Sequence, residues 1–265
     1  MAERTPPLAV ASATVLLVRD GAGGLEVFMV ERHHQVDFAS SALVFPGGKV
    51  DPADRAADLR PRCAGAAALD DEQLALRVAA VRETFEESGV LIARRRGAAA
   101  LLVQAEAGPI EARARAELLA GRVGLGEIAA REDLELACDA LVPFAHWITP
   151  EFMPKRFDTR FYLVAAPPDQ AAAHDGRESV DSLWIAVDRA IEDARAKRRS
   201  IIFPTLRNLV KLGRSRSVAE ALERARREPV VTVLPAVARG PSGPVIRIPR
   251  EAGYDLDEAP IEDLR

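Results

Sequence analysis

The sequence has few cysteines and no long apolar run. Its two cysteines, Cys63 and Cys138, lie 75 positions apart and form no C-x-x-C pair, so a zinc site or redox motif has little support. We expect two free thiols in a reducing cytoplasm, with a single disulfide as the alternative. No window approaches the roughly 18 apolar residues of a membrane span. Residues 1–7 contain no apolar stretch, so we expect no secretory signal.

The sequence also lacks a strong excess of charge of either sign. Lys and Arg total 36 and Asp and Glu total 40, which gives a formal net charge of -4 over 265 residues. A general nucleic-acid binder would show a broad basic surface, so we expect neither a nucleic-acid nor a membrane partner. A hydrophobic content of 48% with 29% charged residues excludes wholesale disorder. The basic residues are nearly all Arg, which together with heavy Ala usage is typical of a high-GC bacterial genome.

The order of β-rich and helical segments indicates an α/β fold. The β-rich runs 14–18 and 25–30 flank a Gly-rich turn and predict a hairpin. We expect further strands at 42–45, 141–148, 157–165, 183–187, 230–234 and 244–248, and helices at 188–198, 204–212 and 217–227. Because strands and helices mix without strict βαβ alternation, the sheet should be mixed and flanked by helices.

The clearest predicted helix covers residues 74–88. Asp70 is a suitable N-cap with Gln73 three residues on, and Gly89 stands where a left-handed C-cap belongs. Four apolar side chains fall within about 60° of one another around the helix. They are Leu74, Val78, Val81 and Phe85. This stripe should face the core.

Three acids share the opposite face of that helix. Glu83, Glu86 and Glu87 are spaced i, i+3 and i+4, so their carboxylates are neighbours. Each like-charge pair costs roughly 0.2–0.5 kcal/mol, and a divalent cation with a preference for hard oxygen ligands would remove that cost. On spacing alone, a solvated acidic helix face remains the alternative.

The surrounding residues resemble the Nudix box, G-x5-E-x7-R-E-U-x-E-E-x-G-U, where U is aliphatic. Its second half is present at 82–90 as R-E-T-F-E-E-S-G-V, and its first half begins at Gly48. Asp54 stands where the box has its first Glu, and Thr84 replaces an aliphatic residue. In addition, 27 residues separate Asp54 from Arg82 where the box has seven. The box is therefore split by an insertion at 55–73.

Together with residues 43–55 and 155–159, the split box resembles the branch of the Nudix hydrolase family that contains the mammalian peroxisomal coenzyme A diphosphatase. This resemblance covers 12–212 and implies a Nudix α/β/α sandwich with a mixed β-sheet. We expect 1–11 to be a tail and 97–138 to be a helical insertion, broken at Gly108-Pro109 and at Gly121, Gly124 and Gly126. Residues 213–265 should be a C-terminal helix and strand extension that packs on the same domain.

The resemblance also implies roles for the box residues. Glu83, Glu86 and Glu87 would bind the catalytic Mg²⁺ or Mn²⁺, with the backbone carbonyl of Gly47 as a further ligand. Arg82 would pair with Asp54 and hold the loop against the helix. An Asp side chain is one methylene shorter than Glu, so this pair needs a closer approach of the loop.

Outside the box, an additional ligand or base is expected on the loop before Trp184. Glu178 is preferred to Asp181 for this role, with an ordinary loop carboxylate as the alternative. Four basic residues are proposed as contacts to substrate phosphates, and a solvated side chain is the alternative for each. They are Arg32, Lys49, Lys155 and Arg156.

The reaction implied is metal-dependent hydrolysis of a diphosphate bond. A divalent ion would neutralise the substrate's charge and activate water for attack on phosphorus. The expected substrate is a nucleoside diphosphate linked to another moiety, with coenzyme A or an acyl-CoA first and ADP-ribose, ADP-sugars or dinucleotides second. A catalytically silent Nudix-fold ligand-binding protein and a scaffold helix without a site remain alternatives. A homodimer is left open.

Overall fold

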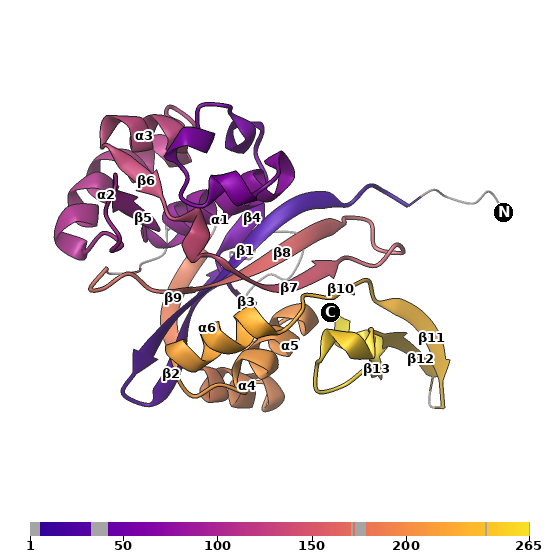
Figure 1. Ribbon diagram of the computed structural model, residues 1–265. Helices are drawn as coiled ribbons and strands as arrows, with labels where there is room; N and C mark the ends of the chain where they lie inside the picture. The colour runs from indigo at the N-terminus through magenta and orange to yellow at the C-terminus, as the bar shows by residue number, and fades with distance from the viewer. Residues whose placement is uncertain (1–5, 33–41, 171, 173–178, 242, 265) are drawn as a thin grey trace.

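An eight-stranded mixed sheet forms the centre of the computed structural model, which describes residues 6–32, 42–170, 172, 179–241 and 243–264 (Figure 1). Its strands are β1 (Val10–Gly21), β2 (Gly24–Arg32), β3 (Leu43–Val44), β4 (Gly47–Lys49), β7 (Val142–Ile148), β8 (Phe157–Ala165), β9 (Ser179–Ala186) and β10 (Thr232–Val233). The strand order is β10-β7-β8-β1-β2-β3, with β4 paired to β1 and β9 paired to β2. The predicted hairpin is confirmed, because β1 and β2 pair antiparallel and turn between Gly21 and Gly24.

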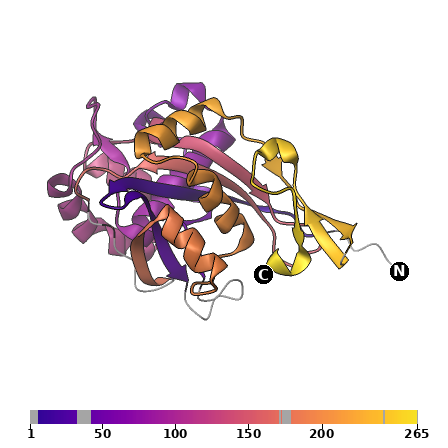
Figure 2. The ribbon, with the colours of Figure 1, turned by 90° about the horizontal axis from the view of Figure 1, so that it is seen from below.

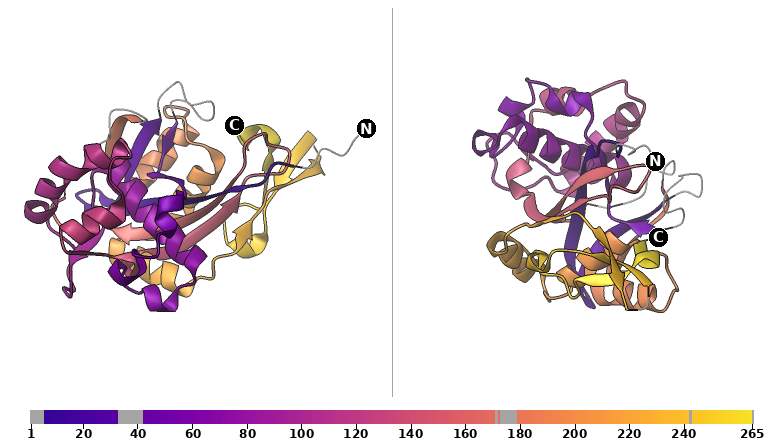
Figure 3. Two further views of the ribbon diagram at one scale, coloured as in Figure 1. Left: turned by 90° about the horizontal axis from the view of Figure 1, so that it is seen from above. Right: turned by 90° about the vertical axis from the view of Figure 1, so that its right-hand side faces the viewer.

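Helices cover both faces of this sheet (Figures 1 and 3). One hydrophobic cluster joins alternate β1 residues such as Val15 and Leu17 to α1 (Asp71–Ser88), α2 (Gln104–Leu119) and α3 (Leu125–Arg131). A second cluster joins Leu16 and Val18 to α4 (Val187–Arg195), α5 (Phe203–Leu212) and α6 (Val218–Arg227), seen in front of the strands in Figure 2. The predicted α/β/α sandwich is therefore confirmed. None of the helices within the described residues has both the length and the apolarity of a membrane span.

The helix that carries the three acids is set by its caps. The Gln73 N–H donates to the Asp70 carboxylate at 2.7 Å, and Gly89 ends the helix in the left-handed region at φ 74°. The four residues of the predicted stripe are all buried. Thr84 is fully buried too, and its hydroxyl donates to the Ala80 carbonyl at 2.7 Å. That internal bond explains how a polar residue occupies an aliphatic position of the box.

The insertion within the box contains two short 3-10 turns, η2 (Arg60–Arg62) and η3 (Ala66–Ala68). A further turn, η1 (Pro52–Arg55), carries Asp54 and leads into the insertion. The Ala64 N–H donates to the Leu136 carbonyl at 2.9 Å, which fastens the insertion to the later part of the chain. Cys63 and Cys138 are both buried and both free, as expected.

Residues 97–138 break between α2 and α3 at Gly121 and Gly124 as predicted, but Gly126 lies inside α3, and the region differs from the prediction in two further ways. Helix α2 continues through Pro109, so the expected break at Gly108-Pro109 is wrong. The missing proline N–H costs one bond to the Ala105 carbonyl, and both residues lie on the exposed face, where water can replace it. The region also contains a strand, β6 (Leu134–Leu136), which forms a two-stranded antiparallel sheet with β5 (Ala93–Arg95).

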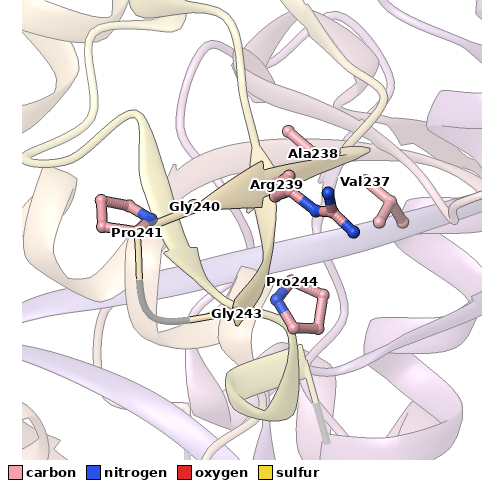
Figure 4. Close-up of a pocket in the computed structure, with 7 residues that line it drawn as sticks. All are labelled: Val237, Ala238, Arg239, Gly240, Pro241, Gly243 and Pro244. Carbon is pink, nitrogen blue, oxygen red and sulfur yellow. The ribbon is translucent and has the colours of Figure 1, made fainter.

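The C-terminal part of the chain adds a strand to the main sheet and a small sheet beside it. Strand β10 pairs parallel to β7, and β11 (Ala236–Gly240), β12 (Gly243–Arg247) and β13 (Glu258–Pro260) form the small antiparallel sheet. Strands β11 and β13 were not predicted. A hollow of about 640 Å³ lies along the β11–β12 hairpin (Figure 4). Among the described residues that line it, Arg239 alone is charged.

Candidate functional site

The site is built where β4 lies between β1 and α1. Strand β4 pairs antiparallel with β1, so that Gly47 lies opposite Thr14 and Gly48 opposite Ala13. A Cβ atom on Gly47 would lie 2.4 Å from the Ala13 carbonyl oxygen, and one on Gly48 would lie 2.3 Å from the Glu83 carboxylate. Glycine is needed at Gly47, where the closest atoms belong to the backbone of β1, whereas a side chain at Gly48 would have to displace the Glu83 carboxylate.

Arg82 is the centre of the polar contacts. Its Nε and Nη2 donate to the two oxygens of Asp54, each at 2.9 Å, and Nη2 also donates to the Lys49 carbonyl at 2.8 Å. Its Nη1 donates to both Glu83 and Glu86 at 2.9 Å. The side chains of Arg82 and Asp54 are only 11% and 2% exposed. The structure thus brings together the predicted pair and holds it in a bidentate geometry.

The short side chain of Asp54 reaches Arg82 because of the turn that carries it. Asp54 is the third residue of η1, and the Asp51 side chain caps this turn by accepting from the Ala53 N–H at 2.8 Å. The Asp51 N–H in turn donates to the Asp54 carboxylate at 2.8 Å. The capping box therefore fixes Asp54, which provides the closer approach of the loop that an Asp requires at this position.

Glu87 joins the helix to the glycine loop. Its carboxylate accepts a hydrogen bond from the Gly47 N–H at 2.9 Å, and the residue is 8% exposed. The side chains of Glu83 and Glu86 are 14% and 17% exposed. Because all three acids are largely buried, the alternative of a solvated acidic helix face is wrong.

This concentration of charge is visible in the pKa values. Burial, together with the charge of Glu86, raises the pKa of Glu83 to about 7, against the lowering effect of Arg82. Burial alone would lower the pKa of Arg82, but its hydrogen bond to Asp54 and the charge of Glu83 raise that pKa above its usual range. One guanidinium thus faces more carboxylates than it can neutralise.

The donor set fits a hard divalent ion in its chemistry, since carboxylate oxygens are what Mg²⁺ and Mn²⁺ prefer. Within the described residues, however, no group of three or more His, Cys, Asp or Glu side chains is arranged to hold a metal. Nη1 of Arg82 bridges Glu83 and Glu86, while Glu87 is turned to Gly47. That Nη1 contacts one oxygen of Glu83 and one of Glu86, and each carboxylate has a second oxygen that an ion can bind. Metal binding by the three acids stays a prediction.

Two predicted site residues lie at the limits of the described chain. Glu178 is outside the described residues. Arg32 ends β2 and pairs through its backbone with Ser179 of β9, and its side chain is not among those described. Their roles as ligand or base and as phosphate contact stay predictions.

The other predicted phosphate contacts lie farther along the sheet or serve the backbone. Lys49 ends β4 with an exposed side chain, and Arg82 uses only its carbonyl. Lys155 is exposed in the turn before β8. Arg156 donates to the Thr149 carbonyl at 3.0 Å and to the Pro7 carbonyl at 2.8 Å, which ties that turn to the N-terminal segment. These contacts give Arg156 a structural task, and its role toward phosphate stays a prediction.

Sequence reasoning missed one residue that reaches the site from α2. Nε of Arg115 donates to the Glu86 backbone carbonyl at 3.1 Å. Because 29 positions separate the two residues and only tertiary packing brings them together, no spacing rule could have found this contact.

Comparison with known proteins decides the family. A model described as the NUDT19 Nudix domain matches residues 60–212, more than half of the chain. The chain belongs to the Nudix hydrolase family. The resemblance carried by the split box is thereby confirmed. Nudix hydrolases generally use divalent metal ions.

The relatives that this Nudix chain matches are longer proteins. It is 28% identical over 190 residues to a putative nudix hydrolase 7 of Caenorhabditis elegans, covering 70% of this chain and 55% of that protein. It is 29% identical over 236 residues to the acyl-coenzyme A diphosphatase NUDT19 of Gallus gallus, covering 71% and 61%. The chain thus spans 55% and 61% of the lengths of these two relatives.

A solved structure shares the fold over most of both chains. It is a NUDIX hydrolase from Alicyclobacillus acidocaldarius, with 26% identity and a TM-score of 0.64. The match covers 82% of this chain and 96% of that one. The α/β/α arrangement described above is therefore that of a solved Nudix hydrolase.

Proposed function

We propose that this Nudix protein hydrolyses the diphosphate bond of a nucleoside diphosphate linked to another moiety, with Mg²⁺ or Mn²⁺ as its cofactor. The observation that carries the proposal is that Glu83 and Glu86 both accept from Arg82 while Glu87, on the same helix, accepts from the N–H of Gly47 in the glycine loop. Coenzyme A or an acyl-CoA is the first substrate to test, since the Gallus gallus relative is an acyl-coenzyme A diphosphatase. ADP-ribose, ADP-sugars and dinucleotides are the second group.

Each part of the site has a separate task in this proposal. Glu83, Glu86 and Glu87 would hold the ion, which supplies neutralisation of the diphosphate and activation of water. Arg82, fixed by Asp54, holds the helix and the loop in register. The absence of a side chain at Gly48 leaves the space that the Glu83 carboxylate occupies beside the glycine loop. Because the acids are largely buried, their attraction for a cation is weakly screened by solvent.

A catalytically silent ligand-binding protein is the second candidate. The arrangement of the acids argues against it, because a buried carboxylate whose pKa is raised to about 7 destabilises the metal-free fold. A protein that only binds a ligand has no evident use for that destabilisation. In a protein that needs a divalent ion for catalysis, binding of the ion to the carboxylate removes it.

One assay tests the proposal. The purified protein is incubated with Mg²⁺ and, in turn, coenzyme A, an acyl-CoA, ADP-ribose, NADH and a dinucleotide, and the products are separated by chromatography. Cleavage of coenzyme A at its diphosphate yields phosphopantetheine and an adenosine bisphosphate. Glu86→Gln should lower the rate at least as much as the ~10–100-fold loss typical of removing a partner of a metal ligand. Glu127→Gln, in an exposed acid of α3, is the matched control and should keep full activity.

The outcomes separate the candidates. If none of the diphosphates in the panel is cleaved in a metal-dependent reaction, the catalytically silent binding protein is left as the explanation. Full activity of Glu86→Gln would overturn the assignment of the metal site. Equal turnover of ADP-ribose and coenzyme A would remove the preference for coenzyme A.

A further inference from the structure

The helical insertion contacts α1 at Glu86, one of the three proposed metal ligands. In α1, the carbonyl of Glu86 lies in the last turn, where a helix leaves its carbonyls without intrahelical partners. The Val90 N–H, which would serve it in a longer helix, donates instead to the Ser88 hydroxyl at 3.2 Å. Nε of Arg115 takes its place by donating to the Glu86 carbonyl at 3.1 Å. This cross-helix bond replaces the missing helical one.

Arg115 is itself held in a fixed position. Its Nη1 donates to Glu111, one turn earlier on α2, at 3.0 Å, and the two side chains are 12% and 29% exposed. Helix α2 is anchored beneath them by buried apolar residues, namely Ala107, Ile110, Ala114 and Leu118. A guanidinium held in this way is a rigid donor, because its fork is already oriented before it meets the carbonyl.

The glycine that ends the Nudix box makes this contact possible. A Cβ atom on Gly89 would lie 2.4 Å from a carboxylate oxygen of Glu111 and 3.0 Å from Nη1 of Arg115. Gly89 therefore does two things. It ends α1 in the left-handed region, and it leaves the space that the Glu111–Arg115 pair occupies.

We propose that Arg115 is a positioning residue that fixes the last turn of α1 and so places the carboxylates of Glu86 and Glu87 for a divalent ion. This inference rests on the proposed metal-dependent function. Glu86 and Glu87 project from the turn whose backbone Arg115 holds, and Glu87 must also keep its bond to the Gly47 N–H. The guanidinium of Arg115 is also a cation at the C-terminal end of α1, where it interacts favourably with the helix dipole. The helical insertion thereby acquires a function.

The test compares Arg115→Ala and Arg115→Lys with a control on the same helix, Arg113→Ala. The Arg113 side chain is 56% exposed and pairs with Glu132 at 3.1 Å, and this pair does not involve α1. Binding of Mn²⁺ to each metal-free protein is measured by calorimetry, and kcat and the KM for metal are measured with the substrate that the panel identifies. Unfolding in EDTA confirms that each variant is folded.

Removal of an outer partner of a metal ligand typically lowers affinity or activity 10–100-fold, and we expect that range for the Mn²⁺ affinity of Arg115→Ala. Arg115→Lys should recover part of it, because an ammonium can reach the carbonyl but cannot also match Glu111 with a planar fork. Arg113→Ala should equal the wild type. Wild-type Mn²⁺ affinity and metal KM in a folded Arg115→Ala protein would overturn the inference.

The two proposals fail in different ways. If the wild type hydrolyses a diphosphate and Arg115→Ala matches it in rate and metal affinity, the positioning role is wrong and the proposed function stands. If the wild type cleaves nothing while Arg115→Ala binds Mn²⁺ more weakly than the wild type, the positioning role stands and the proposed function is wrong.

Discussion

Replacing Glu83 by Gln should make the metal-free protein more stable while it removes a proposed ligand. Burial first, and then the charge of Glu86, raises the pKa of Glu83 from 4.5 to about 7. Because a tenfold change in proton affinity corresponds to about 1.36 kcal/mol, keeping Glu83 ionised costs on the order of 3 kcal/mol at pH 8. Gln is neutral and similar in size, and its carbonyl can still accept from Arg82. We expect Glu83→Gln to gain 1–3 kcal/mol, on the order of that cost.

The dependence on pH follows from the direction of the shift. A carboxyl whose folded pKa lies above its unfolded value contributes its full stability below pH 4.5 and loses it as the pH rises through about 7. The advantage of Glu83→Gln should therefore be large at pH 8 and shrink toward pH 5. The assay is urea unfolding in EDTA at both pH values, with Glu127→Gln as a control that should follow the wild type.

Addition of Mg²⁺ should reverse the order of stability. An ion that binds only the folded state stabilises it by an amount that grows with concentration relative to Kd, and the wild type should gain more than the variant. Equal stability of the two proteins in EDTA at pH 8, or a difference that does not change with pH, would refute the reasoning.

Three further changes test other parts of the site. Asp54→Ala removes the bidentate partner of Arg82, which keeps its contacts to Glu83 and Glu86, and should cost about 1.5–3 kcal/mol in urea unfolding; a loss below about 1 kcal/mol would contradict the pairing. Gly48→Ala puts a methyl group against the movable end of Glu83, so far-UV circular dichroism should show an intact fold while diphosphate hydrolysis falls; unchanged activity would show that Glu83 need not lie there. Thr84→Val restores the aliphatic residue of the box and should change the free energy of unfolding little, because the lost hydroxyl serves only the Ala80 carbonyl; a loss beyond about 1 kcal/mol in urea unfolding would reveal a role for the hydroxyl.

The features that the sequence predicted well are the local ones. The caps at Asp70 and Gly89 and the shared face of the three acids depend on residues a few positions apart, whose angles a helix determines. The pairing of Asp54 with Arg82 spans the insertion, and it was predicted only through the resemblance to the Nudix box. The structure explains it by the capped turn that carries Asp54.

What could not be predicted depends on tertiary packing. The contact between Arg115 and Glu86 requires α2 to lie against the end of α1, which no pattern within either helix states. The sequence predicts a helix break at Pro109, because the exposure of Pro109 and Ala105, which lets water replace the missing hydrogen bond, is known only from the fold. Strand β11 carries mostly exposed side chains, so no buried face shows in its sequence.

The central claim is that Glu83, Glu86 and Glu87 of the split box hold a divalent ion on one face of α1. The most direct measurement is the anomalous scattering of Mn²⁺ in crystals of the wild-type protein soaked with the metal. We expect a peak coordinated by these carboxylates. No peak, or a peak elsewhere in the molecule, would contradict the assignment of the metal site.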